Sequence, residues 1–254
     1  MIKTLIITGL GINSEEETAF CFQRAGSEIS FVHINDLIQN HKILDQHQIL
    51  AFPGGFSYGD HTGSGNAFAN KIKNHLLEPI IKFADQDKLI IGICNGFQIL
   101  TNLGLLPRTE SNHPSREAVL MPNESATFQC HWTDLKISSQ KCVWTKDINE
   151  IELPIAHGEG NFYCSPATLK TLISNDQIAL QYKNNPNGSL HDIAGICDPT
   201  GKIFGLMPHP ERFNSFANHP NWQTKKEVLV RQKQPIPEIG DGQKIFDNAI
   251  NYFQ

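Results

Sequence analysis

Hydrophobic and polar positions alternate regularly over the first hundred residues. Short runs of apolar and β-branched residues are separated there by segments whose apolar residues recur at helical spacing. The runs predict strands at 3–8, 29–34, 48–52 and 88–93, and the spacing predicts helices between 14 and 26, at about 65–84 and at 96–103. Such alternation is typical of β–α–β units and of a parallel twisted sheet.

The first predicted helix has boundary signals at both ends. Asn13 or Ser14 can cap its N-terminus, and three glutamates at 15–17 suit the positive end of the helix dipole. Gly26 is a typical terminator. The strand run 88–93 has no polar alternation, which indicates a strand covered on both faces of the sheet.

The second half of the chain has a more antiparallel pattern. Strands are predicted at 126–137, 142–145, 153–156, 177–182, 190–197 and 202–207. The turn cluster at 184–188 makes 177–182 and 190–197 a hairpin. Residues 212–242 lack clear periodicity and are predicted to form a long loop, whereas 242–253 carries an apolar helical face.

Neither a repeat nor a linker divides the chain, so residues 1–254 are predicted to form a single α/β domain. We expect a mostly parallel central sheet with helices on both faces and a smaller antiparallel portion. Apolar residues are 39% and charged residues 19% of the sequence, which excludes a disordered chain.

Charge and hydropathy narrow the function classes. The net charge of −5 gives no global attraction to nucleic acid or to an anionic membrane. No apolar run approaches the roughly 18 residues that span a bilayer, and the N-terminus is predicted to be a buried strand rather than a signal peptide. We therefore expect a cytoplasmic protein with neither a nucleic acid nor a membrane as partner.

The six cysteines and eleven histidines form no metal-binding pattern. No C-x-x-C, H-x-x-x-H or H-E-x-x-H spacing occurs, so no metal site is predicted. In a cytosolic chain the cysteines are expected to be buried free thiols, with one of them a candidate nucleophile.

That candidate is Cys94, in the segment 92–96 with the sequence GICNG. It follows the predicted strand 88–93 and precedes a helix. Glycines two residues before and after a nucleophile permit a sharp strand-to-helix turn, and the Asn95 N–H can then donate to an oxyanion. The helix N-terminus would stabilise a thiolate. The alternative is a buried cysteine that merely lies between two glycines.

A nucleophilic thiol needs a base, and His209 is the candidate. It follows the strand 202–207 between two prolines that stiffen the loop. Glu211 points the same way in an extended chain and can fix the imidazole tautomer. The alternative is a proline-rich surface turn, but together with the elbow a Cys–His–Glu triad is the better hypothesis.

A second glycine loop, 53–60, follows the strand 48–52. If it faces Cys94, Gly55 can offer a second oxyanion donor beside the Asn95 N–H. The alternative is an ordinary glycine-rich turn. Neither a dinucleotide fingerprint nor a G-x-x-x-x-G-K-[ST] phosphate loop is present.

Four strings carry a family resemblance: PGGFSYGD at 53–60, GICNGFQIL at 92–100, AHGEGNFYC at 156–164 and MPHPER at 207–212. Together they resemble the class I glutamine amidotransferases and, within them, the glutaminase subunits of phosphoribosylformylglycinamidine synthase. The resemblance implies a flavodoxin-like fold. It also implies Cys94 as nucleophile, His209 as base and Glu211 as its orienter, with Gly55 and Asn95 as the oxyanion hole.

The same resemblance implies a substrate site and partners. Gln98 would contact the substrate glutamine, and His157, Gly158 and Glu159 would line the site. The chain would hydrolyse glutamine through a thioester intermediate and release ammonia to an ATP-dependent synthetase subunit, with a small accessory subunit bridging them. The chain would bind no cofactor itself, and ATP and Mg²⁺ would bind at the synthetase. The product would be formylglycinamidine ribonucleotide, in purine biosynthesis.

Three alternatives stay open from sequence. One is a glutaminase subunit for pyridoxal phosphate, histidine or GMP synthesis. Another is a cysteine hydrolase with the same elbow, such as a peptidase or a deglycase. The third is a binding module whose thiol is idle.

Overall fold

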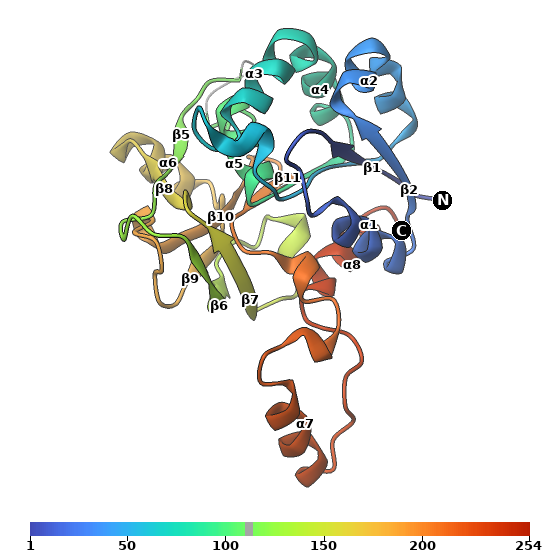
Figure 1. Cartoon of the computed structure of the whole chain (residues 1–254), viewed down its shortest axis with the longest axis vertical. Coiled ribbons are helices and arrows are strands. Elements are labelled where there is room, and N and C mark those ends of the chain that lie inside the picture. Colours follow the sequence, from blue (N-terminus) through green and yellow to red (C-terminus); the bar gives the residue numbers. More distant parts are fainter. Residues whose placement is uncertain (110–113) are drawn as a thin grey trace.

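The computed structural model describes residues 1–109 and 114–254, and its centre is a mixed sheet of nine strands (Figure 1). Five neighbouring strands are parallel, in the order β2 (Glu28–His33), β1 (Lys3–Thr8), β3 (Ile49–Phe52), β4 (Leu89–Ile93) and β11 (Ile203–Leu206). Four antiparallel strands continue the sheet, β10 (Ile193–Cys197), β9 (Ile178–Tyr182), β6 (Gln129–Ile137) and β7 (Glu150–His157). The predicted α/β class is confirmed.

Helices cover both faces of the parallel strands, as expected for strands without polar alternation. In Figure 1, α1 (Glu15–Arg24) and α8 (Gln243–Asn251) lie on one side, and α3 (Asn66–His75), α4 (Leu77–Ala84) and α5 (Asn95–Leu103) lie on the other. Phe22 of α1 meets Phe246 of α8 edge to face, with ring centroids 4.9 Å apart. All five residues of β4 are buried between these layers.

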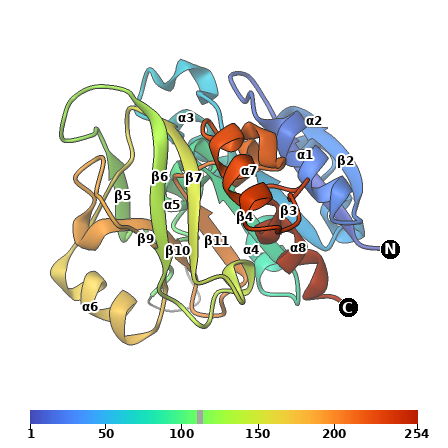
Figure 2. The same cartoon turned by 90° about the horizontal axis from the view of Figure 1, so that it is seen from below.

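The antiparallel strands lie side by side next to the helix-covered half (Figure 2). The predicted hairpin of β9 and β10 is confirmed, with the turn cluster 184–188 between the strands. A separate two-stranded sheet joins β5 (Ala118–Met121) to β8 (Asn161–Cys164), and α6 (Pro166–Ser174) follows it. In the parallel half, a short helix α2 (Ile34–Gln39) follows β2 directly. None of the helices in the described ranges is long and apolar enough to cross a bilayer.

Three local predictions are wrong. The helix predicted at about 65–84 is divided, because the backbone leaves helical geometry at Leu76 with φ −131°. The strand predicted at 142–145 is a short 3-10 helix, Val143–Thr145, in which the turn buries Trp144 and its indole N–H donates to the Lys202 carbonyl. Ser14 occupies the N-cap of α1, but its hydroxyl binds Asn13 and Arg212 instead of a backbone N–H.

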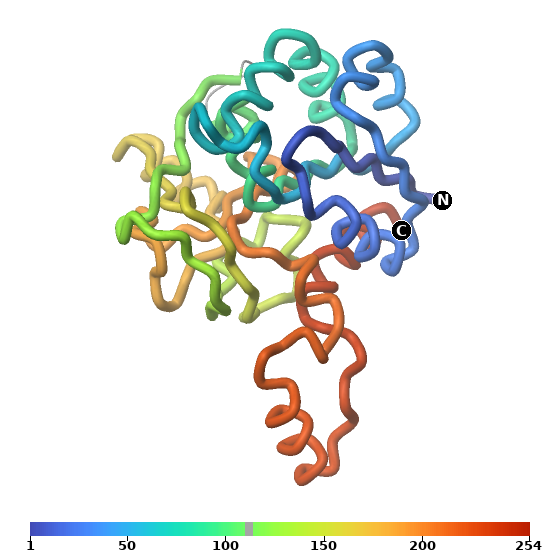
Figure 3. Tube along the Cα trace, viewed as in Figure 1, coloured from blue at the N-terminus to red at the C-terminus, as the bar shows by residue number. Residues whose placement is uncertain are grey.

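The loop predicted at 212–242 contains a helix, α7 (Trp222–Arg231), on an arm that projects from the body (Figure 3). Of the ten residues of α7 none is buried, so no apolar stripe was required and no periodicity marked it. The two legs of the arm meet at its base. There Ser215 and Ile239 form an isolated antiparallel β-bridge, and the Gly242 N–H donates to the Phe213 carbonyl.

Candidate active site

The candidate site lies where three neighbouring parallel strands end. Phe52 of β3 pairs with Gly92 of β4, and Ile93 of β4 pairs with Leu206 of β11. The segments that follow these strands therefore emerge at one edge of the sheet, as is general for ligand sites of open α/β sheets. They carry the glycine loop, the candidate nucleophile and the candidate base.

Cys94 lies on a sharp turn between β4 and α5. Its backbone has φ +50° and ψ −103°, a strained conformation for a residue with a side chain. A Cβ at Gly96 would overlap the Phe52 carbonyl, and one at Gly92 would lie 2.6 Å from the Gly96 oxygen. Both glycines are thus required by close packing, and the predicted sharp strand-to-helix turn at Cys94 is confirmed.

The thiol of Cys94 faces the end of strand β7 and lines a cavity there. Its sulfur lies 3.7 Å from the Ala156 carbonyl oxygen at the end of β7, and the residue is 4% exposed. The backbone N–H donates to the Leu206 carbonyl, which ties the turn to the neighbouring strand β11. The sulfur therefore lies at a cavity wall and keeps limited access to solvent.

His209 and Glu211 form a buried pair. The imidazole Nδ1 lies 2.6 Å from Glu211 Oε1, and the two residues are 2% and 0% exposed. The backbone N–H of His209 donates to the Pro154 carbonyl of β7, which fixes the loop that carries the imidazole. With Nδ1 paired to the carboxylate, only Nε2 remains for proton transfer.

The Cys94 side chain acts on the same imidazole. Burial opposes protonation of His209, but the negative charges of Glu211 and Cys94 and the bond to Glu211 raise the pKa of His209 to about 10. The imidazole Nε2 is buried and has no hydrogen-bond partner in the described part of the chain. The three predicted triad residues are therefore brought together.

A Cys94→Ala variant should lower the pKa of His209. The substitution removes a negative charge that favours the imidazolium, while the Glu211 carboxylate remains. An NMR titration that follows the His209 ring protons in both proteins measures the shift. An unchanged or higher pKa in the variant would contradict the contact between the two side chains.

The two candidate oxyanion donors are free of internal acceptors. Within residues 1–109 and 114–254, neither the Gly55 N–H nor the Asn95 N–H donates a hydrogen bond. Gly55 has φ +155°, and a Cβ there would lie 2.5 Å from the Gly11 oxygen, so the loop requires glycine. Both N–H groups lie near the turn at Cys94 and can donate to a negative charge that forms on a substrate oxygen. Their role as an oxyanion hole stays a prediction.

A cavity of about 150 Å³ opens beside the thiol. It is lined by Gly55, Phe56, Asp60, Ser64, Cys94, Gln98, Phe128, Ala156, His157, Gly158 and Glu159. All four residues predicted to contact substrate line it, together with the nucleophile and one oxyanion donor. Asn95, His209 and Glu211 are not among the residues that line it.

Gln98 joins helix α5 to the opposite wall. Its Nε2 donates to the Glu159 carbonyl at 2.7 Å, and its Oε1 accepts from Asn95 Nδ2 at 2.9 Å. The Glu159 carboxylate in turn accepts from the Ser64 N–H at 3.0 Å. The side chain of Gln98 is therefore held in place before substrate binds, and its contact with glutamine stays a prediction.

Five residues that line the cavity were not predicted from sequence: Phe56, Asp60, Ser64, Phe128 and Ala156. Asp60 accepts from Asn95 Nδ2 and from the Ser64 hydroxyl, and burial raises the pKa of its carboxyl group. The ring centroids of Phe56 and Phe128 lie 6.1 Å apart, and both side chains are exposed. Phe56 and Asp60 belong to the glycine loop and could have been found there, whereas nothing in the local pattern marks Phe128.

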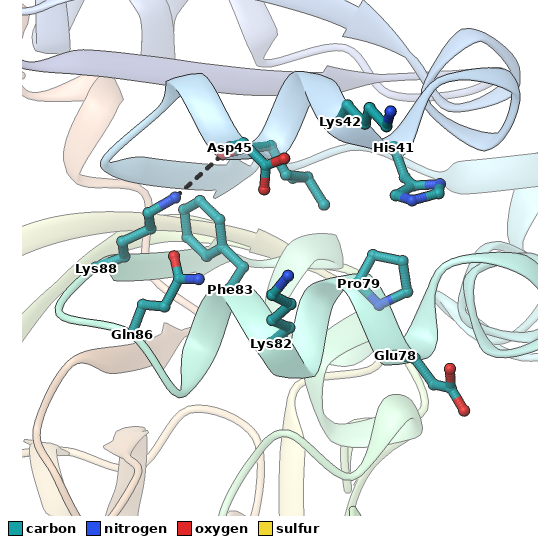
Figure 4. A pocket seen from close by; sticks show the side chains of 10 residues that line it. His41, Lys42, Asp45, Glu78, Pro79, Lys82, Phe83, Gln86 and Lys88 are labelled. Carbon is teal, nitrogen blue, oxygen red and sulfur yellow. Dashed lines mark hydrogen bonds between the residues drawn. The ribbon is translucent and has the colours of Figure 1, made fainter.

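A second hollow lies between the 3-10 helix His41–Gln46 and α4 (Figure 4). Its volume is about 320 Å³, and Lys88 beside it donates to the Leu44 carbonyl and lies over the Phe83 ring. None of the predicted site residues lines it. In the described ranges, no cluster of three or more His, Cys, Asp or Glu side chains is arranged to hold a metal ion.

Comparisons with known proteins agree with this geometry. The model of the CobB/CobQ-like glutamine amidotransferase domain matches residues 1–253. The chain is 49% identical over 264 residues to phosphoribosylformylglycinamidine synthase subunit PurQ of Methanococcus maripaludis, covering 99% of this chain and 97% of that protein. It is 42% identical over 259 residues to the PurQ subunit of Dehalococcoides mccartyi, with the same coverage.

A solved structure shares both fold and sequence. A chain in the structure of PurLQS from Thermotoga maritima superposes with a TM-score of 0.76 at 30% identity. The match covers all of this chain and 99% of that one.

Proposed function

The chain belongs to the CobB/CobQ-like glutamine amidotransferase family, and from this premise we propose that it is the glutaminase subunit of phosphoribosylformylglycinamidine synthase. One observation carries the mechanism. A strained elbow holds the Cys94 thiol against an imidazole whose other nitrogen is paired with the buried Glu211 carboxylate. This arrangement activates a sulfur nucleophile.

The first half-reaction forms a thioester. The Cys94 thiolate attacks the side-chain amide carbon of glutamine, and the Gly55 and Asn95 N–H groups donate to the oxygen that becomes negative. In a comparable protease site one such donor is worth about 2.7–4 kcal/mol. His209 gives its proton to the departing nitrogen, the carbon–nitrogen bond breaks, and ammonia leaves.

The second half-reaction regenerates the thiol. His209, now neutral, removes a proton from water, which attacks the glutamyl thioester. The carbon–sulfur bond breaks, glutamate leaves, and the proton returns to the Cys94–His209 pair. Glu211 keeps the imidazole oriented through both steps, because its carboxylate stays within 2.6 Å of Nδ1.

The ammonia is used by a second protein. The sequence contains no phosphate-binding loop of its own, so ATP and Mg²⁺ bind to a synthetase subunit that converts formylglycinamide ribonucleotide into formylglycinamidine ribonucleotide. The similarity to a chain of PurLQS from Thermotoga maritima supports an assembly with a synthetase and a small accessory subunit. We place this assembly in the cytoplasm.

Glutaminase turnover measured with and without the co-expressed synthetase tests the proposal. We expect glutamine hydrolysis that the partner stimulates, together with synthesis of the amidine product. Diazo-oxo-norleucine should label Cys94, because it resembles glutamine and reacts with an activated thiol. No hydrolysis in the presence of the partner, or no labelling, would refute the function.

A further inference from the structure

The imidazole of His157 lies in a closed network beside the active site. Its Nδ1 is 3.0 Å from Asn123 Oδ1, and its Nε2 is 3.5 Å from Asn187 Nδ2. All three residues are buried, with exposures of 1% or 2%. Asn123 precedes strand β6 and Asn187 lies in the β9–β10 turn, so two distant segments meet on one ring.

The amide contacts define which ring nitrogen carries the proton. Asn123 Nδ2 donates to the Thr127 and His157 carbonyls, so its Oδ1 must be the acceptor for His157 Nδ1–H. Asn187 Nδ2 then donates to Nε2. A proton on Nε2 would point at the Asn187 Nδ2–H group and prevent this hydrogen bond.

The surroundings keep the ring uncharged. Burial and, to a smaller extent, the positive charge of His209 lower the pKa of His157 to about 4. At neutral pH, His157 therefore has neither the charge nor a free nitrogen for acid–base chemistry.

The residues on both sides of His157 belong to the cavity wall and contact the candidate site through their backbone carbonyls. On one side, the Ala156 carbonyl faces the Cys94 sulfur at 3.7 Å. On the other, the Glu159 carbonyl accepts from Gln98 at 2.7 Å. The ring packs so closely on Gly160 that a Cβ there would lie 2.7 Å from Nε2, and Asn123 Oδ1 accepts from the Gly160 N–H.

We propose that Asn123 and Asn187 are positioning residues that lock neutral His157 and thereby fix the wall 156–159 in the geometry that binds glutamine. The inference rests on the proposed function and refines it, since the resemblance implied that His157 itself contacts substrate. A displaced wall would lose its bond to Gln98 and weaken glutamine binding before it affected the triad.

Asn123→Ala and Asn187→Ala variants, assayed in the complex with the synthetase, test this. Each variant loses several buried hydrogen bonds that hold His157 and Gly160 in place. We expect KM for glutamine to rise about tenfold, while kcat stays within about threefold of the parent value. Circular dichroism melting selects folded variants. If Asn123→Ala does not fold, Asn187→Ala decides. An unchanged KM, or a fall in kcat alone, would overturn the proposal.

A conservative pair at His157 separates positioning from chemistry. In His157→Asn, the amide N–H can occupy the place of Nδ1–H toward Asn123, whereas His157→Ala has no donor. We expect His157→Asn to keep KM at least about threefold closer to the parent value than His157→Ala does. Equal loss in both variants would overturn the positioning role.

Asn184→Ala is the matched control. Asn184 lies in the same turn as Asn187, but its side chain is exposed at the surface of that turn. We expect an unchanged KM, and an increase equal to that of Asn187→Ala would overturn the proposal. If the parent complex hydrolyses glutamine and the variants show no shift, the inference fails while the proposed function stands. If the parent complex is inactive, the proposed function fails.

Discussion

A Cys94→Ala variant of the complex is expected to lose glutamine-dependent synthesis and to keep ammonia-dependent synthesis. Among the residues that line the described cavity, Cys94 alone carries a thiol, and it is the proposed nucleophile, so glutamine turnover should fall by a factor on the order of 10⁴ or more. Added ammonia bypasses this site and still reaches the synthetase. Both rates are measured as amidine product in the presence of ATP.

The matched control for this experiment is Cys130→Ala. Cys130 is an exposed free thiol on β6 and does not line the cavity. Its replacement should leave both rates unchanged. Glutaminase turnover that persists in Cys94→Ala would refute the assignment of the nucleophile, and loss of the ammonia-dependent rate would indicate that the complex had not assembled.

A Gly96→Ala variant is expected to show the largest loss of stability from a single methyl group. The added Cβ would overlap the backbone carbonyl of Phe52, which cannot rotate away as a side chain would. Strand β3 and helix α5 must then separate, and we expect the free energy of unfolding to fall by about 3 kcal/mol. Denaturant unfolding followed by circular dichroism measures the change.

Gly158→Ala is the control for that prediction. A Cβ at Gly158 would meet only Phe128, at an ordinary 3.8 Å, and the residue lacks a positive φ. Its free energy of unfolding should change by less than about 0.5 kcal/mol, as is usual for substitutions without a packing cost. Equal stability of the two variants would show that the approach of α5 to β3 is not tight.

The parallel half and the triad were predictable because their signals are local. Buried strands such as 88–93 are continuous apolar runs, and the elbow around Cys94 requires glycines at fixed spacing. The strand register then brings the two motifs together, because β4 and β11 are adjacent parallel strands and Cys94 and His209 follow their ends. The motif sequences therefore defined the candidate triad, whose catalytic role stays a prediction.

The remaining features depend on tertiary contacts. The sequence at 142–145 resembles a strand, but burial of Trp144 determines its turn. Helix α7 has no buried face, so periodicity could not reveal it. The contacts of His157 with Asn123 and Asn187 join residues 34 and 30 positions away, and nothing in the local pattern links them.

The change from parallel to antiparallel pairing between β11 and β10 bears on how the two sides of the site can change by mutation. Gly55, Cys94 and Gln98 come from the parallel half, whereas His157 and Phe128 come from or adjoin the antiparallel strands β7 and β6. The proposed catalytic groups and much of the opposing cavity wall thus belong to separate parts of the sheet. If the proposal is right, mutations on the antiparallel side can alter substrate selectivity without changing the groups that break the bond.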